Sequence, residues 1–209
     1  MRRSISHESN DMEVHRVEDK KSELFKCGKE LFSTKGFKDT NIADITKMAG
    51  VAVGTFYNYY PSKEKLFMEI FQEENVKLMK TLTASIDMND EPIRIIHRMM
   101  ESNIKGMLEN PILMQWYNKD VYAKIERLFK DENGLNAADF LYRDAILMVR
   151  AWQDEGKMRN DISSEMIMAI FGAIINIGMH KEEIGLQYFP DIQYYLTEFV
   201  MKGLAENQG

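Results

Sequence analysis

Apolar residues recur at three- and four-residue steps along most of the chain, which is the spacing of helices with one buried face. Residues 40–60 show this pattern in two short segments. The apolar positions of the first segment are Ile42, Ile45, Met48 and Ala49. Thr40 or Asn41 can cap its start, and Gly50 supplies a turn residue before a second short helix over residues 53–59. Two short helices joined by a tight turn form a helix-turn-helix, which lays its second helix in the major groove of DNA.

The remaining apolar spacing predicts an all-α chain, because we find no alternation of the kind that strands require. The other predicted helical segments are 17–35, 62–84, 92–109, 112–118, 121–130, 137–155, 165–180 and 190–205. From this pattern we expect a polar, disordered arm over residues 1–16, a helix-turn-helix domain over 17–62, and a second, helical domain over 63–209. The long helix that ends near Ala84 should link the two domains.

Composition limits the classes of function. The formal net charge is -6. Residues 18–65 hold 9 Lys and Arg against 7 Asp and Glu, whereas residues 66–209 hold 15 against 23. Only the predicted helix-turn-helix part is basic, and mildly so, which argues against a protein that coats nucleic acid through a strong positive field.

Other sequence signals point to a cytoplasmic protein without a cofactor. Cys27 is the single cysteine, so no internal disulfide framework is possible. No apolar run approaches the ~20 residues of a membrane span, and the first residues lack the apolar core of a secretory signal. The four histidines are scattered, and neither a metal-ligand spacing nor a catalytic motif is present. We therefore expect no enzyme, no metal and no membrane partner.

The residues that flank the helix-turn-helix are more specific than its spacing, which an ordinary helical hairpin inside a core would also satisfy. Upstream stands Leu31-Phe32-x-x-Lys35-Gly36-Phe37, and downstream stands Tyr57-Asn58-Tyr59-Tyr60-Pro61-Ser62-Lys63-Glu64-Lys65-Leu66-Phe67. The segment from Leu24 to Phe71 resembles the N-terminal domain of the TetR family of bacterial repressors. The rest of the chain resembles that family only in length and helical pattern. The resemblance implies a homodimeric transcriptional regulator that binds double-stranded operator DNA.

The resemblance also implies roles for single residues. Tyr57, Tyr59 and Lys63 match positions that hold phosphates, and Thr40 matches a contact to the DNA backbone. Val53, Gly54 and Thr55 match the positions nearest the base edges, while Tyr60 is expected to lie in the core.

The recognition helix departs from the family's pattern in its polar residues. The family often has Ser at Ala52, Lys or another polar residue at Val53, and His at Asn58. With so few hydrogen-bonding side chains, base readout should be sparse and DNA shape should contribute more. Asn58 completes the predicted DNA-binding set.

The helix over residues 165–180 is apolar nearly all round, so it must be covered on every side. Together with the helix over 190–205 it predicts a four-helix interface between two copies of the chain. The predicted interface residues are Ile170, Gly172, Ile174, Ile177, Tyr195 and Phe199. If both helices instead pack wholly within one chain, no such interface follows.

A few polar groups stand among the apolar stripes of the second domain, which is how a small-molecule site looks. The candidate ligand-binding residues are His97, Trp116, Tyr117, Phe140, Met148, Trp152, Phe171 and Asn176, with His180 as a further polar anchor. These residues favour a small hydrophobic or aromatic effector that releases a repressor from its operator. A DNA-binding dimer without a ligand and a helical enzyme or carrier remain as alternatives.

Overall fold

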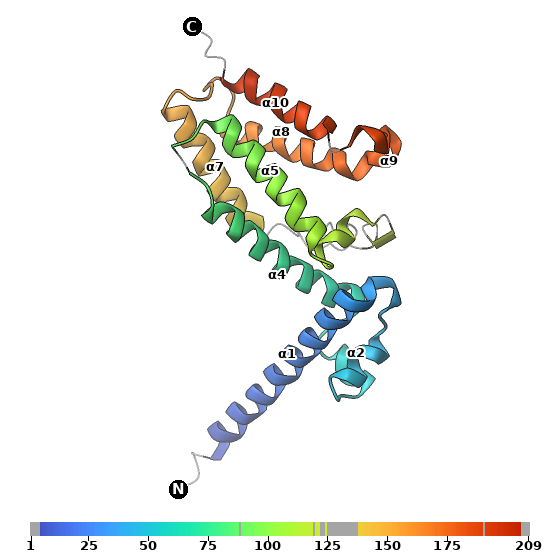
Figure 1. Cartoon of the computed structure of the whole chain (residues 1–209). Coiled ribbons are helices and arrows are strands. Elements are labelled where there is room, and N and C mark those ends of the chain that lie inside the picture. Colours follow the sequence, from blue (N-terminus) through green and yellow to red (C-terminus); the bar gives the residue numbers. More distant parts are fainter. Residues whose placement is uncertain are drawn as a thin grey trace. The chain divides into compact units, whose positions relative to one another are not determined.

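The computed structural model describes residues 5–87, 89–118, 120–121, 124, 138–189 and 191–205. Within these ranges every regular element is a helix (Figure 1), which confirms the all-α prediction. The chain divides into two compact units. Unit 1 contains Met1–Asn75 and Met107–Asn133, and unit 2 contains Val76–Gly106 and Gly134–Gly209. The divisions fall inside helices α4 and α5, and the domain boundary predicted at residues 62 and 63 stays a prediction.

Unit 1 begins with α1 (Ile5–Asp39), which interrupts its helical backbone at Gly36, where φ is 81°. The helix begins at Ile5, which lies inside the segment over residues 1–16 that we predicted to be a disordered arm. Its polar first turns continue a helix that the buried residues downstream have already nucleated, and adding residues to an existing helix is far cheaper than starting one. The unit continues through α2 (Ile42–Met48), α3 (Val53–Tyr57) and the first half of α4 (Lys63–Ala84).

Aromatic rings form the centre of unit 1. The Phe67 ring of α4 meets Phe32 and Phe37 of α1 edge-on, with centroid distances of 5.1 and 4.9 Å. All three side chains are almost fully buried, as are Leu24 and Leu66 beside them. Because these residues come from α1 and α4, their burial holds the two helices together.

A segment from much later in the chain also belongs to unit 1. It consists of the end of α5 (Pro92–Glu109) and the 3-10 helix η1 (Leu113–Tyr117). Trp116 stacks on Phe71 of α4 with a centroid distance of 5.5 Å. Asn110 donates to Glu74 Oε2 at 2.8 Å, and the other carboxylate oxygen of Glu74 pairs with Lys29 Nζ at 2.6 Å. Glu74 therefore joins α1, α4 and this later segment.

Unit 2 is a helical bundle with α8 packed against both α7 and α10. Besides the remaining parts of α4 and α5, its elements are α7 (Ala138–Asp154), α8 (Ser164–Ile177), η2 (Gly178–His180), α9 (Lys181–Ile184), η3 (Leu186–Tyr188) and α10 (Asp191–Ala205). The short elements α9 and η3 lie between the two helices predicted over 165–180 and 190–205.

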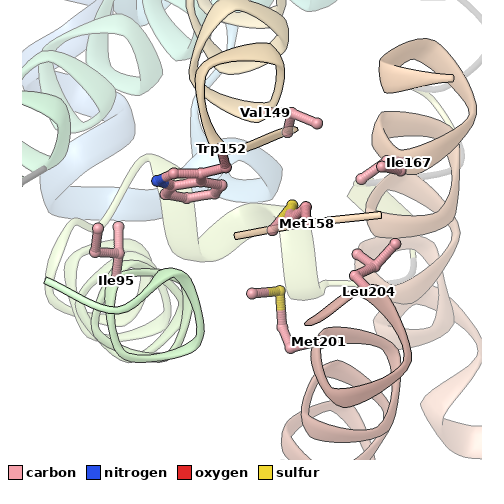
Figure 2. Close-up of a cluster of buried hydrophobic side chains, with 7 residues drawn as sticks. All are labelled: Ile95, Val149, Trp152, Met158, Ile167, Met201 and Leu204. Atoms are coloured by element: carbon pink, nitrogen blue, oxygen red, sulfur yellow. The ribbon is translucent and has the colours of Figure 1, made fainter. Parts of the chain in front are cut away.

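The core of unit 2 surrounds Trp152, whose side chain has no exposed surface. Figure 2 shows its indole between Ile95 of α5 and the side chains contributed by α7, α8, α10 and the turn after α7. The fully buried members are Ile95, Val149, Trp152, Met158, Ile167, Met201 and Leu204. No helix of the described residues is both long enough and apolar enough to cross a lipid bilayer.

Candidate functional site

The helix-turn-helix is positioned by its caps and its turn. Asn41 is the N-cap of α2, and its side-chain oxygen accepts from the Asp44 amide at 2.8 Å. Of the two predicted capping residues, the structure therefore selects Asn41. Gly50 follows α2 with φ of 65°, a backbone conformation that glycine adopts without the steric cost of a Cβ. The predicted turn is confirmed at this residue.

The short helix α3 buries one side chain and exposes its neighbours. Phe56 has no exposed surface, whereas Val53 is 46% exposed and Tyr57 is 55% exposed. Nothing lies within 4 Å of a Cβ built at Gly54, and Asn58 is exposed. Thr55 and Tyr59 are half-buried. The predicted base-reading and phosphate-binding residues of α3 thus lie together on one short helix. The exposed side chains of this helix are apolar and aromatic, and no other part of unit 1 covers them.

Tyr60 differs from these tyrosines, because only 3% of its surface is exposed. Its hydroxyl donates to Glu69 Oε1 at 3.4 Å, and its ring lies 5.4 Å from Lys21 Nζ. Burial and the Glu69 carboxylate together raise the pKa of Tyr60. The prediction that Tyr60 is a core residue is confirmed.

Two residues that we predicted to contact DNA instead donate their hydrogen bonds to backbone carbonyls of the protein. Thr40 has no exposed surface, and its hydroxyl donates to the Gly36 carbonyl at 2.8 Å. Lys63 Nζ donates to the carbonyl oxygens of Phe37 and Thr40, each at 2.7 Å. Desolvation by burial lowers the pKa of Lys63. A phosphate contact by either residue stays a prediction, and sequence spacing gave no sign of these internal bonds.

The predicted effector residues fall in both units. Trp116 and Tyr117 lie in η1 of unit 1, where burial raises the pKa of Tyr117. His97, Met148, Trp152 and Phe171 lie in unit 2, and the last three belong to its core or pack against it. Phe140 is part of α7, but its side chain lies outside what the structure describes.

The two polar anchors predicted on and after α8 face solvent in the single chain. Asn176 is exposed and donates to the Gly172 carbonyl of its own helix at 3.0 Å. The side chain of His180 is 63% exposed and lies 3.0 Å from Glu183 Oε2. The structure therefore does not bring either residue into the buried interior with Trp152, and their ligand contacts stay a prediction.

Different polar atoms are buried in the interior of unit 2. Among the described residues, three buried side-chain atoms have no hydrogen-bond partner: His97 Nε2, Asn103 Oδ1 and Trp152 Nε1. An unpaired buried polar atom costs about 1–3 kcal/mol, so such atoms often mark a place where a ligand or water binds. Asn103 was not predicted. It lies four residues from both Met99 and Met107 on α5, a spacing that could have placed it on the apolar stripe.

The residues predicted for the dimer interface are unevenly covered within one chain. Tyr195 and Phe199 of α10 are 54% and 62% exposed, and their rings stack with a centroid distance of 6.4 Å. Gly172 has open space where a Cβ would stand. Ile170 and Ile177 are half-buried, and Ile174 is buried within the chain. α8 and α10 also expose Met166, Ile175 and Tyr194.

Comparison with known proteins matches the N-terminal part of the chain. The family model of the bacterial regulatory proteins, tetR family, matches residues 24–70. The uncharacterized HTH-type transcriptional regulator YdgC of Bacillus subtilis is 34% identical over 73 residues, which are 34% of this chain and 37% of YdgC. The HTH-type transcriptional repressor DhaR of Mycobacterium sp. is 32% identical over 72 residues, which are 34% of this chain and 36% of DhaR. The chain thus spans less than half of the length of these curated relatives.

Solved structures match over nearly the whole chain. RolR in complex with resorcinol gives a TM-score of 0.66 at 14% identity, covering 93% of this chain and 91% of RolR. FadR of Thermus thermophilus in complex with lauroyl-CoA gives 0.64 at 18% identity, covering 90% and 97%. At these identities the likeness establishes a shared fold.

Proposed function

We propose that this chain, whose N-terminal domain belongs to the tetR family of bacterial regulatory proteins, is a dimeric transcriptional repressor that a small apolar effector releases from operator DNA. The curated relatives that it matches are transcriptional regulators, so the proposal assigns it no enzymatic activity.

The observation that carries the DNA-binding part is the surface of α3. A five-residue helix with one buried side chain exposes Val53, Gly54 and Tyr57 and contributes little to the core of unit 1. An open glycine allows close approach of the DNA, and the valine methyl groups suit contact with a thymine methyl. Tyr57 and Tyr59 can donate their hydroxyls to phosphates while Asn58 lies beside them.

The dimer is supported by the exposed aromatic surface of α10. Tyr195 and Phe199 form an uncovered stacked pair, and α8 exposes further apolar residues. A second copy of the chain has the same surface, and a two-fold axis would bring the two surfaces together as a self-complementary interface. Such a dimer would present two recognition helices to a palindromic or nearly palindromic operator.

The effector is supported by the interior of unit 2. Its core is apolar, yet His97, Asn103 and Trp152 each bury a polar atom without a partner. An apolar molecule with a few hydrogen-bonding groups would pair these atoms and contact the apolar side chains around them. The similarly folded RolR and FadR are described with resorcinol and lauroyl-CoA, an aromatic compound and an acyl thioester.

The test begins with the DNA. Purified protein is used to select fragments of its own genome, and the selected sites are mapped by footprinting. We expect a short palindromic site upstream of a limited number of genes. Selection of fragments without any shared sequence would reject the proposed operator binding.

The effector is tested on the operator found in this way. Resorcinol, lauroyl-CoA, 2-naphthol and medium-chain fatty acids are scored by thermal shift and by release of the protein from operator DNA. We expect an active compound to lose potency against His97→Ala but to retain it against Leu147→Ala, a control at an exposed residue of α7 that is not among the candidate ligand-binding residues. Failure of all of these compounds to release the protein from its operator would contradict the proposed effector class.

A further inference from the structure

The side chain of Lys63 is held by the connection between α1 and α2. Its ammonium group donates to the Phe37 and Thr40 carbonyls at 2.7 Å and lies 4.3 Å from the centroid of the Phe37 ring. These contacts reach 26 and 23 residues back along the chain. Hydrogen bonds from a charged donor are about twice as strong as those between neutral groups. Lys63 thus fastens the first residue of α4 to the backbone that leads into α2.

Side chains donate hydrogen bonds to the carbonyls at the end of α1, where the helix itself supplies no donors. The chain leaves the helical conformation at Gly36, and the Gly36 carbonyl accepts from the Thr40 hydroxyl at 2.8 Å. The carbonyls of Phe37 and Thr40 take their donors from Lys63. Asn41 caps α2 immediately afterwards, and α2 packs against α3. Any shift of residues 36–41 would therefore move α2 and carry the recognition helix with it.

We propose that Lys63 is a positioning residue, which strengthens operator binding by fixing the start of α2 relative to α1 and α4 instead of by contacting a phosphate. Two of the three ammonium N–H groups are already used by carbonyl oxygens. Turning the group toward DNA would break two charge-assisted hydrogen bonds to part-buried carbonyls, in exchange for one phosphate contact that salt screens. This inference rests on the proposed DNA binding.

The salt dependence of operator binding separates the two roles. Removing one phosphate contact makes the slope of log K against log salt shallower by about 0.9, whereas poorer positioning lowers affinity equally at every salt concentration. For Lys63→Met we expect affinity about tenfold lower with an unchanged slope, measured at a temperature where circular dichroism shows the variant to be folded. Lys26→Met, at an exposed lysine of α1, is the control for removal of one charge from the same unit.

A shallower slope for Lys63→Met, by about one unit relative to Lys26→Met, would overturn the inference, as would affinity equal to that of the wild type. If the wild-type protein binds no operator, the proposed function fails instead. These outcomes are therefore distinguishable.

Nuclear magnetic resonance of the wild-type protein gives a second test, which is needed if Lys63→Met does not fold. The ammonium signal of Lys63 is identified by its disappearance in Lys63→Arg. Held by two carbonyls, this group should be protected from solvent exchange before DNA is added and should keep its chemical shift in the operator complex. Scalar coupling between its nitrogen and a DNA phosphorus atom would overturn the inference.

Discussion

Replacement of Phe199 by serine should break the proposed dimer. In the single chain 62% of Phe199 is exposed, so with about 200 Å² for the whole residue roughly 125 Å² is available for burial. At about 25 cal/mol per Å² this amounts to ~3 kcal/mol for each copy and ~6 kcal/mol for a two-fold dimer. The serine side chain recovers part of this burial, so we expect the dissociation constant to rise between about 10²- and 10⁴-fold.

Sedimentation velocity over a wide range of protein concentrations measures this dissociation constant. Leu147→Ser is the matched control, because Leu147 is 60% exposed but lies on α7. It should dimerise like the wild type. The reasoning would be refuted if Phe199→Ser left the dimer intact, or if Leu147→Ser weakened it to the same extent.

Four further predictions concern unit 1. Tyr59→Phe should weaken operator binding severalfold without changing sequence preference, whereas Thr55→Ala should relax preference at one base position; binding to a panel of single-base operator variants measures both. Asn41→Ala removes the cap of α2 and should lower the free energy of unfolding by about 1 kcal/mol in chemical denaturation, and an unchanged value would disprove the capping role. Glu74→Gln should lower the thermal midpoint more than Glu73→Gln, because the Glu74 side chain is only 14% exposed and binds two partners; equal shifts would contradict this.

Helix starts and turns could be predicted from the sequence where the residues that decide them are close together in the chain. The apolar spacing predicted helices that start near residues 62 and 165. In the structure Ser62 accepts from the Lys65 amide at the start of α4, and Ser163 accepts from the Met166 amide at the start of α8. Gly50 takes the positive φ that the short turn required. In each case the deciding interaction lies within four residues, so the pattern of residue types contains the necessary information.

The parts that escaped prediction depend on contacts between distant residues. Nothing in the local sequence of Lys63 shows that two carbonyls more than twenty residues away will take its hydrogen bonds. Likewise, Trp116 could be recognised as a bulky apolar residue, but its stacking on Phe71 follows only from the folded chain. Asn103 stood on an apolar stripe, yet its unpaired oxygen appears only when the neighbouring helices are in place.

The docking of η1 onto α4 has a consequence for exchanging parts between related regulators. A DNA-binding head cut out at residue 75 would keep Phe71 without Trp116 and Glu74 without Asn110, so the aromatic ring would lose its stacking contact and the carboxylate would keep Lys29 but lose one hydrogen bond. A chimaera that grafts this head onto a foreign effector domain should therefore fold and respond only if residues 107–121 travel with it. The transferable piece of this protein is discontinuous in sequence, with residues 76–106 inserted between its two parts.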